Sequence, residues 1–321
     1  MRVASGLVAF TATAAPAALI MSAAGGDQAD ALVKLLGQMV RIHEMRLADD
    51  ASSPLHPAAW RSISELERST FSRDDESASA NDEVASKGSV YARAQTDGEL
   101  TDEGVATLLD LLQLSPSSVF ADLGSGRGGV LLRVATAAPT RGCFGVEFIG
   151  YKHQAAGRLL DAARRRPEIE LAGPVQFRQG DMVELASWAA EGKEGAAEEG
   201  FSISELSHAF MCSVCFDDVL LRQVAMDLAN RTTFPHMQAL VSMRALPSQP
   251  HFVPVGRVTL CSTWNALAQA HVYVPADLLS CPEQDWPLQM LERVCCASGA
   301  CTLPPRLAWG NDAIVRLPGR A

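Results

Sequence analysis

The chain has 321 residues, and 48% of them are hydrophobic against 20% charged, so there is ample material for a packed core. The absence of a short repeat and the modest net charge exclude collagen-like, coiled-coil and wholly disordered chains. The 27 basic and 37 acidic residues leave a formal charge of −10, which argues against a protein built mainly to bind nucleic-acid phosphates. The 8 cysteines are sparse for this length and indicate reduced thiols.

The first 26 residues stand apart by composition. They carry one charge, at Arg2, and are rich in Ala, Ser and Thr, with a small-residue run at Ser22–Ala24 suited to cleavage. Pro16 and the many small residues make a membrane span unfavourable here. A targeting segment, a disordered tail and an ordinary helix stay open for this segment. No later stretch is apolar enough to cross a membrane.

Residues 27–90 are expected to form a helical extension and a linker. Apolar residues repeat at helical spacing over 28–48, and the polar, charged stretch 72–89 is typical of a linker. A further helix is expected from Asp102. Thr101 is a suitable N-cap for it, and two acids in its first turn complement the helix dipole.

After residue 118, short apolar runs alternate with segments of helical pattern. Such alternation predicts parallel strands joined by right-handed crossovers. The last two strands are joined by a connection too short for a crossover helix, so they should pair antiparallel. We expect an α/β fold with a doubly wound, mostly parallel seven-stranded sheet over residues 91–275, and we assign no elements to 276–321. The expected strands are 119–123, 143–148, 175–178, 208–213, 239–243, 257–262 and 269–274, and the expected helices include 130–138, 151–166 and 217–230.

A glycine-rich stretch is the most informative part of the sequence. Gly124, Gly126 and Gly129 satisfy the pattern G-x-G-x-x-G directly after an expected strand and before an expected helix. Glycine at these positions lets the backbone turn tightly and approach a ligand closely. By itself the pattern also fits a dinucleotide-binding enzyme.

Three acidic residues narrow the choice of ligand. Asp122 lies two residues before the first glycine, where a carboxylate suits a cationic or amino-bearing group better than a pyrophosphate. Glu147 ends the next strand, where an acid can accept hydrogen bonds from both ribose hydroxyls. Asp181 follows the third strand, within reach of an adenine amino group. Together they indicate S-adenosylmethionine, although a helix cap, a solvent-facing acid and a simple turn are their structural alternatives.

The stretch Asp122–Gly129 resembles motif I of class I S-adenosylmethionine-dependent methyltransferases. More narrowly, residues 91–274 resemble the disruptor-of-telomeric-silencing (DOT-type) family of histone-lysine methyltransferases. The family usually has Tyr where this chain has Asp97, and an aromatic residue where it has Met182. The resemblance rests on Asp97–Leu100, Val119–Gly126, Gly145–Glu147, Gly180–Met182 and Ser262–Trp264.

The resemblance implies a role for each matching residue. The loop at 97–100 would close over the methionine end of the cofactor, and the glycine-rich stretch would wrap the methionine and ribose. Glu147 would hold the ribose, and the residues after the third strand would flank adenine. The implied cofactor-binding residues are Asp97, Gly98, Glu99, Leu100, Phe120, Asp122, Leu123, Gly124, Ser125, Gly126, Arg127, Gly128, Gly129, Glu147, Asp181 and Met182.

The fourth strand departs from the family. The family has an Asn-Asn-aromatic run there, and this chain has Met211–Phe216 without either Asn. Ser213 and Phe216 are our candidates for lining the acceptor channel, and Glu99 for aiding lysine deprotonation in apolar surroundings. We expect no metal site, because the zinc-like pair Cys212 and Cys215 has no second pair to complete it.

Function follows as an expectation with alternatives. The leading one is methyl transfer to a protein lysine, with a histone or nucleosome as partner and the nucleus as location. An organelle or secretory destination stays open because of the N-terminal segment. The alternatives are another protein or a small molecule as acceptor and a non-catalytic cofactor-binding domain. An NAD-dependent oxidoreductase is the last of the alternatives. With Arg164–Arg166 the single compact basic run, direct nucleic-acid contact should not dominate.

Overall fold

The computed structural model describes residues 57–71, 98–191, 200–280 and 290, which lie in a compact unit spanning residues 54–304. The strands are β1 Val119–Leu123, β2 Gly142–Glu147, β3 Val175–Gln179, β4 His208–Met211, β5 Ala239–Ser242, β6 Phe252–Leu260 and β7 Ala268–Pro275. The α-helices are α3 Pro57–Thr70, α6 Asp102–Leu112, α7 Gly129–Ala137, α8 Gly150–Arg164, α9 Leu185–Glu191 and α11 Asp218–Leu228. Short 3₁₀ turns are η1 Met182–Glu184, η2 Ile203–Glu205, η3 Ser213–Cys215 and η4 Ala276–Ser280.

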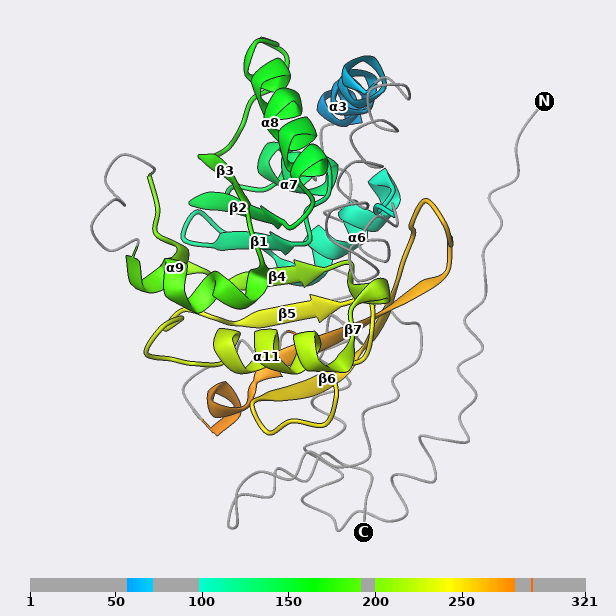
Figure 1. The fold of residues 1–321 in the computed structure, drawn as a ribbon. Coiled ribbons are helices and arrows are strands. Elements are labelled where there is room, and N and C mark those ends of the chain that lie inside the picture. The colour runs from blue at the N-terminus through cyan, green and yellow to red at the C-terminus, as the bar shows by residue number, and fades with distance from the viewer. Residues whose placement is uncertain (1–56, 72–97, 192–199, 281–289, 291–321) are drawn as a thin grey trace, which may run out of the picture. The chain divides into compact units, whose positions relative to one another are not determined.

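The strands form a 7-stranded sheet in the order β3-β2-β1-β4-β5-β7-β6 (Figure 1). Strands β1 to β5 pair in parallel, whereas β7 pairs antiparallel with both β5 and β6. The chain runs outward from β1 to β2 and β3, and then returns to β4 on the other side of β1, so the strand order reverses at β1. The expected doubly wound, mostly parallel sheet with an antiparallel end is therefore confirmed. Ligands of such sheets bind at the carboxyl ends of the strands near the reversal.

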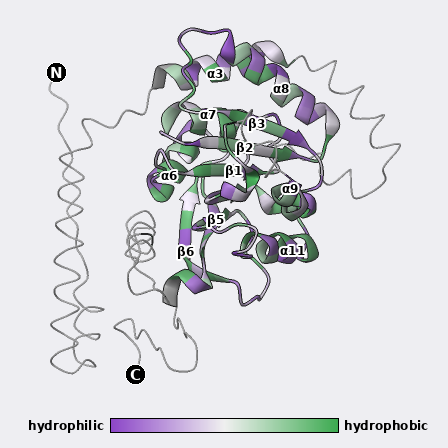
Figure 2. Ribbon diagram, turned by 90° about the vertical axis from the view of Figure 1, so that its left-hand side faces the viewer, coloured by the Kyte–Doolittle hydropathy of each residue, from purple (hydrophilic) through white to green (hydrophobic). Residues whose placement is uncertain are grey.

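The sheet is covered on both faces, and each face has its own hydrophobic core. Phe120 and Phe210 lie in the core under α3, α6, α7 and α8. Ala121 and Leu123 lie in the opposite core with α9 and α11. Strands buried on both faces should read as near-continuous apolar runs, and β1 does so except at the buried Asp122. In Figure 2, β1 is largely hydrophobic, whereas α8 mixes hydrophobic and hydrophilic residues as an outer helix must.

Helix starts follow their capping residues. Thr101 caps α6 by accepting a hydrogen bond from Gly104 N at 3.3 Å, as expected. Asp217 caps α11 by accepting from Leu220 N at 2.8 Å, so α11 begins within one residue of the expected position. Each cap residue lies where the chain enters its helix, so it fixes the residue at which the helix begins.

The expected bounds of the fourth and sixth strands were wrong, and the sixth also ends at Leu260 instead of residue 262. The fourth strand stops at Met211 because the next residues form η3, closed by a hydrogen bond from Phe216 N to Ser213 O at 3.0 Å. The sixth strand begins at Phe252, five residues before Arg257. The sequence predicts a later start because of Pro254. Proline is unfavourable within a β-sheet and is tolerated only at an edge strand or a bulge. β6 is such an edge and is bulged at this proline.

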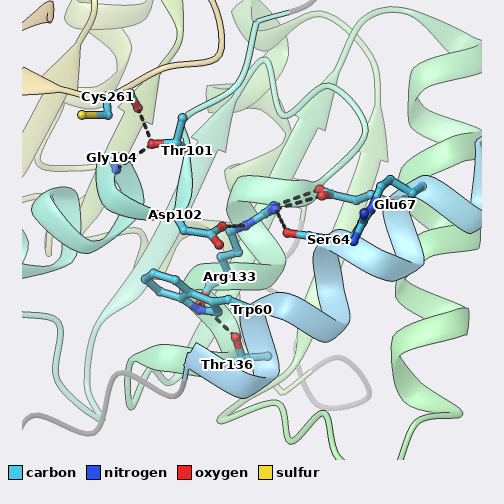
Figure 3. A network of polar contacts seen from close by, with 10 residues as sticks. Trp60, Ser64, Glu67, Thr101, Asp102, Gly104, Arg133, Thr136 and Cys261 are labelled. Atoms are coloured by element: carbon cyan, nitrogen blue, oxygen red, sulfur yellow. Dashed lines mark hydrogen bonds and ion pairs between the residues drawn. The ribbon is translucent and has the colours of Figure 1, made fainter. Parts of the chain in front are cut away.

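Helix α3 joins the sheet domain from outside the expected range 91–275. Its buried Trp60, Ile63 and Leu66 pack into the core beneath α7 and α8. Glu67 forms a bidentate pair with the buried Arg133 of α7, with N–O distances of 2.9 and 2.8 Å (Figure 3). The buried ion pair and the apolar contacts together fix α3 on this face.

Several expectations fall outside the described residues. These are the segment 1–26, the helix at 28–48, the linker at 72–89 and most of 276–321. Among the helices that the structure does describe, none is long and apolar enough to cross a membrane.

Candidate functional site

The loop after β1 is built from glycines in left-handed conformations. Gly124, Gly126 and Gly128 have φ of +92°, +55° and +86°, which side chains with a Cβ rarely adopt. Gly124 N and Ser125 N both donate to Val146 O, each at 2.9 Å, so the loop is tied to the end of β2. The loop then leads directly into α7.

Two carboxylates flank this loop from the strand ends. Glu147, at the end of β2, accepts from Gly126 N and from Ile149 N, each at 2.8 Å. Asp122, in β1, is 2% exposed. Its burial, and then the negative charges of Glu99 and Glu147, raise the pKa of Asp122 to about 8. In the ligand-free chain near pH 7, Glu99 and Glu147 therefore supply the negative charge around the glycine-rich loop, and Asp122 beside them is mostly protonated.

Glu99 reaches the loop from a segment that pairs with the β6–β7 connection. Glu99 N donates to Thr263 Oγ1 at 3.2 Å, and Thr263 N donates to Glu99 O at 2.8 Å. The Glu99 carboxylate lies 3.9 Å from where a Cβ on Gly126 would stand and 3.0 Å from the same point on Gly129. The tertiary fold thus brings the loop expected at 97–100 onto the glycine-rich stretch, although Asp97 itself lies outside the described residues.

The β4 end adds a sulfur and an aromatic ring to the site. Cys212 Sγ donates to Gly98 O at 3.4 Å, and burial raises the pKa of this thiol to about 12. Phe216 Cζ lies 3.0 Å from the point where a Cβ on Gly124 would stand, and Met182 Cε lies 3.9 Å from the same point. Phe216 and Met182, expected on the acceptor and adenine sides respectively, therefore meet at the first glycine of the loop.

Ser125 supplies a buried polar atom at the loop. Its Oγ is buried and has no hydrogen-bond partner among the described residues. A buried hydroxyl without a partner is costly, and a bound polar ligand removes that cost. The open glycine conformations, the three acids and this hydroxyl all fit a cofactor that carries hydroxyl and cationic groups.

Some of the expected site residues contact the hydrophobic cores or neighbouring protein atoms in the ligand-free chain. Phe120 and Leu123 are fully buried, one in each core. Asp181 caps η1 by accepting from Val183 N at 3.1 Å. Ser213 is wholly buried, and its hydroxyl is 2.7 Å from Ser242 Oγ. In the ligand-free chain the Ser213 hydroxyl is thus bonded to the end of β5, and its role in lining the acceptor channel stays a prediction.

Two residues of the site escaped the sequence analysis. Cys212 was considered as a zinc ligand, and its contact with Gly98 is a product of tertiary packing. Trp264 was noted in the resemblance without a role, and its ring packs 2.6 Å from where a Cβ on Gly98 would stand. No local pattern shows that the β6–β7 connection returns to the 98–100 segment. Among the described residues, no group of three or more His, Cys, Asp or Glu could hold a metal ion.

The strand order, the glycine-rich loop after β1 and the acids at the ends of β1 and β2 define a Rossmann-like class I methyltransferase fold. Within this class the chain resembles one family in particular. The family model described as "Histone methylation protein DOT1" matches residues 88–182. This range includes Gly98–Leu100, the glycine-rich loop and Glu147, and it ends at Met182. No curated protein matches the chain.

Solved structures resemble the chain at low identity. An RNA methyltransferase from Salinibacter ruber, in complex with S-adenosyl-L-homocysteine, has 18% identity and a TM-score of 0.34 over 53% of this chain and 88% of its own. A geranyl diphosphate C-methyltransferase from Streptomyces coelicolor has 16% identity and a TM-score of 0.30 over 43% of each chain. TrmK from M. capricolum has 8% identity and a TM-score of 0.34 over 53% of this chain and 66% of its own.

Proposed function

We propose that this protein is an S-adenosylmethionine-dependent methyltransferase that transfers methyl to a lysine of a protein, with a histone as the leading acceptor. The observation that carries the proposal is the cluster of Asp122, Glu147 and Glu99 around the glycine-rich loop. A sulfonium ligand with an amino-acid end and ribose hydroxyls complements such a cluster in charge and in hydrogen bonding. The match of residues 88–182 to the DOT1 histone methylation family supports the acceptor class.

Different residues of the site would bind different parts of the cofactor. Glu147 would accept hydrogen bonds from the ribose, and Asp122 with Glu99 would face the cationic methionine end. Met182 would pack against adenine as a soft, polarizable side chain. S-Adenosylmethionine supplies an electrophilic methyl group on its sulfonium sulfur. Catalysis then depends mainly on alignment, because methyl transfer requires an in-line approach by the nucleophile.

A lysine acceptor must be neutral to attack. Apolar surroundings lower the pKa of a lysine, and the ring of Phe216 at the loop would contribute such surroundings. Glu99 is half-buried beside the loop and could take the proton. A histone acceptor would place the protein in the nucleus.

Calorimetric titration with S-adenosylmethionine tests the cofactor site. Asp122→Ala and Glu147→Ala should each weaken binding by roughly 1.5–3 kcal/mol, because each removes an acceptor from a buried polar contact. Asp161→Ala, on the exposed face of α8, is the matched control and should leave binding unchanged. If both site variants bind as tightly as the unmodified chain, the cofactor assignment fails.

A methyl-transfer assay tests the acceptor. Tritiated S-adenosylmethionine would be incubated with recombinant nucleosomes, free core histones or a protein extract, each over a salt series. The acidic balance of −10 predicts weak intrinsic affinity for nucleosomes, because nucleosome binding draws on clustered Lys and Arg. We therefore expect transfer to nucleosomes to need a partner protein or low salt. Robust transfer by the isolated chain at physiological salt would contradict that expectation.

A non-histone protein acceptor is the second candidate. The specific observation in its favour is the segment Met211–Phe216, which lacks the Asn pair of the DOT-type family. Labelling of bands other than histones in the extract, with nucleosomes and free histones unlabelled, would select this candidate. Absence of labelling in every arm, with cofactor bound, would point to a non-catalytic binding domain.

A further inference from the structure

A short turn between β4 and α11 carries Phe216 to the glycine-rich loop, and Arg244 contacts this turn at two points and the first residue of α11 at a third. The guanidinium of Arg244 donates to the backbone carbonyl of Phe216. A different guanidinium nitrogen donates to Asp218 Oδ1 at 2.5 Å. The backbone N–H of Arg244 donates to Ser213 Oγ at 3.0 Å. Both ends of the turn are therefore bonded to one residue that follows β5.

Two buried serines complete the attachment. Ser213 Oγ and Ser242 Oγ lie 2.7 Å apart, and Ser242 Oγ donates to Arg244 O at 2.7 Å. Both serines are fully buried. The hydroxyls therefore hold the Arg244 backbone against the start of the turn, while the Arg244 side chain holds its end. Buried polar networks with satisfied partners fix a single local arrangement.

The geometry of the turn decides where the Phe216 ring stands. Arg244 binds the backbone carbonyl of Phe216 itself. It also binds the carboxylate of Asp218, two residues further along the chain. The ring itself packs beside Gly124 and near Met182 Cε. Arginine suits this task because its planar group presents several donors in a fixed fork, whereas lysine offers one flexible ammonium.

We propose that Arg244 is a positioning residue, which holds the Phe216 ring against the first glycine of the loop and so shapes the cofactor and acceptor site. The proposal deepens the proposed function and rests on it for its consequence in binding. Arg244 lies outside the family-matched range 88–182, so the family match did not point to it.

The placement of the ring is tested without any ligand. The full chain, labelled with ¹³C in its methionine methyl groups, would be studied by NMR, and the Met182 signal assigned with Met182→Leu. Because aromatic rings shift the resonances of nearby methyls, the Met182 methyl reports the position of Phe216. Arg244→Gln should move this signal in the same direction as Phe216→Ala, and Arg244→Lys should move it by a smaller amount.

Arg231 offers a matched control. It also binds a carboxylate and a backbone carbonyl, through Asp277 at 2.6 and 3.0 Å and Met237 O at 2.5 Å. Arg231 and Met237 precede β5 and Asp277 follows β7, so Arg231 does not contact the Phe216 turn through these bonds. Arg231→Gln should leave the Met182 signal in place. A Met182 signal unmoved by Arg244→Gln, or moved equally by Arg231→Gln, overturns the proposal.

The consequence for binding is measured by calorimetry with S-adenosylmethionine. Arg244→Gln should weaken binding about 3- to 10-fold, and adding it to Phe216→Ala should cause almost no further loss, because residues that act through one another are not additive. Fully additive losses overturn the proposal. Failure of the unmodified chain to bind would instead overturn the proposed function, and the NMR result would still decide the role of Arg244.

Discussion

At the scale of single residues, Asp122 shows how a site can be made at a cost in stability. Its carboxyl is buried in β1 beside Glu99 and Glu147, and these surroundings raise its pKa to about 8. The folded chain therefore holds this proton more tightly than the unfolded chain does. The stabilising contribution is complete below the ordinary pKa of 3.8 and is lost as pH rises through about 8.

The substitution Asp122→Asn removes this pH dependence while keeping a polar side chain of similar size. We expect it to raise the free energy of unfolding of the ligand-free chain by about 2–4 kcal/mol at pH 8, since each pKa unit corresponds to about 1.4 kcal/mol. The gain should be smaller at pH 5. Urea denaturation at the two pH values measures the difference. An equal change at both values, or a change as large for the exposed Asp161→Asn, would count against this account.

At the scale of elements, α3 is attached to α7 by a buried ion pair. The Arg133 side chain is 7% exposed, donates to both Glu67 oxygens, and also donates to Asp102 Oδ1 at 2.8 Å at the start of α6 (Figure 3). Trp60 Nε1 donates to the Arg133 carbonyl at 3.1 Å, so α3 is fixed near both of its ends. Arg133 thus links three helices that are separate in the sequence.

Arg133→Met should cost about 2–4 kcal/mol of unfolding free energy, because it leaves the mostly buried Glu67 carboxylate without its partner. Adding Glu67→Leu should restore part of that loss. The exposed pair Arg166 and Glu168, at 3.3 Å, is the control, and Arg166→Met should change stability by less than about 1 kcal/mol. Equal losses for Arg133→Met and Arg166→Met in urea denaturation would show that burial of the pair is unimportant.

Two helical glycines test how closely the elements pack. A Cβ on Gly104 of α6 would stand 2.0 Å from the backbone oxygen of Cys261, whereas a Cβ on Gly157 of α8 would have no atom within 4 Å. Gly104→Ala should therefore lower the free energy of unfolding by about 1–3 kcal/mol through overpacking. Gly157→Ala should raise it by about 0.5–1 kcal/mol through helix propensity. Thermal unfolding of both variants checks the opposite signs, and the same sign for both would contradict the packing described.

At the scale of the whole molecule, the compact unit of residues 54–304 holds α3, the sheet and the site together. A chain shortened to residues 54–304 should therefore bind S-adenosylmethionine within about 2-fold of the full chain, since it keeps the packed elements. Shortening to residues 72–304 removes α3 and should lower the thermal midpoint, because Ile63 and its neighbours leave the core. Unchanged unfolding after loss of α3 would show that the helix is dispensable.

Much of the fold was predictable because it depends on patterns of residues that are close together in the sequence. The β1 bounds, the glycine-rich loop and the Thr101 cap agree with the structure. These features depend on residues close together in the chain, such as an apolar run, a left-handed turn or a hydroxyl at a helix start. The start of β6 was missed because Pro254 opposes strand structure locally, and the edge of the sheet tolerates it.

The sequence by itself therefore determined the mostly parallel sheet with its antiparallel end, and the acids near the ends of β1 and β2. Tertiary structure alone decided which distant side chains meet those acids. It brought Glu99 to the loop through its pairing with Thr263, and Phe216 to Gly124 through a turn bonded to Arg244. It also placed the Ser213 hydroxyl within hydrogen-bonding distance of Ser242, the last residue of β5. The physical reason is that hydrophobic periodicity encodes which face of an element is buried, whereas contacts between loops depend on how complete elements pack.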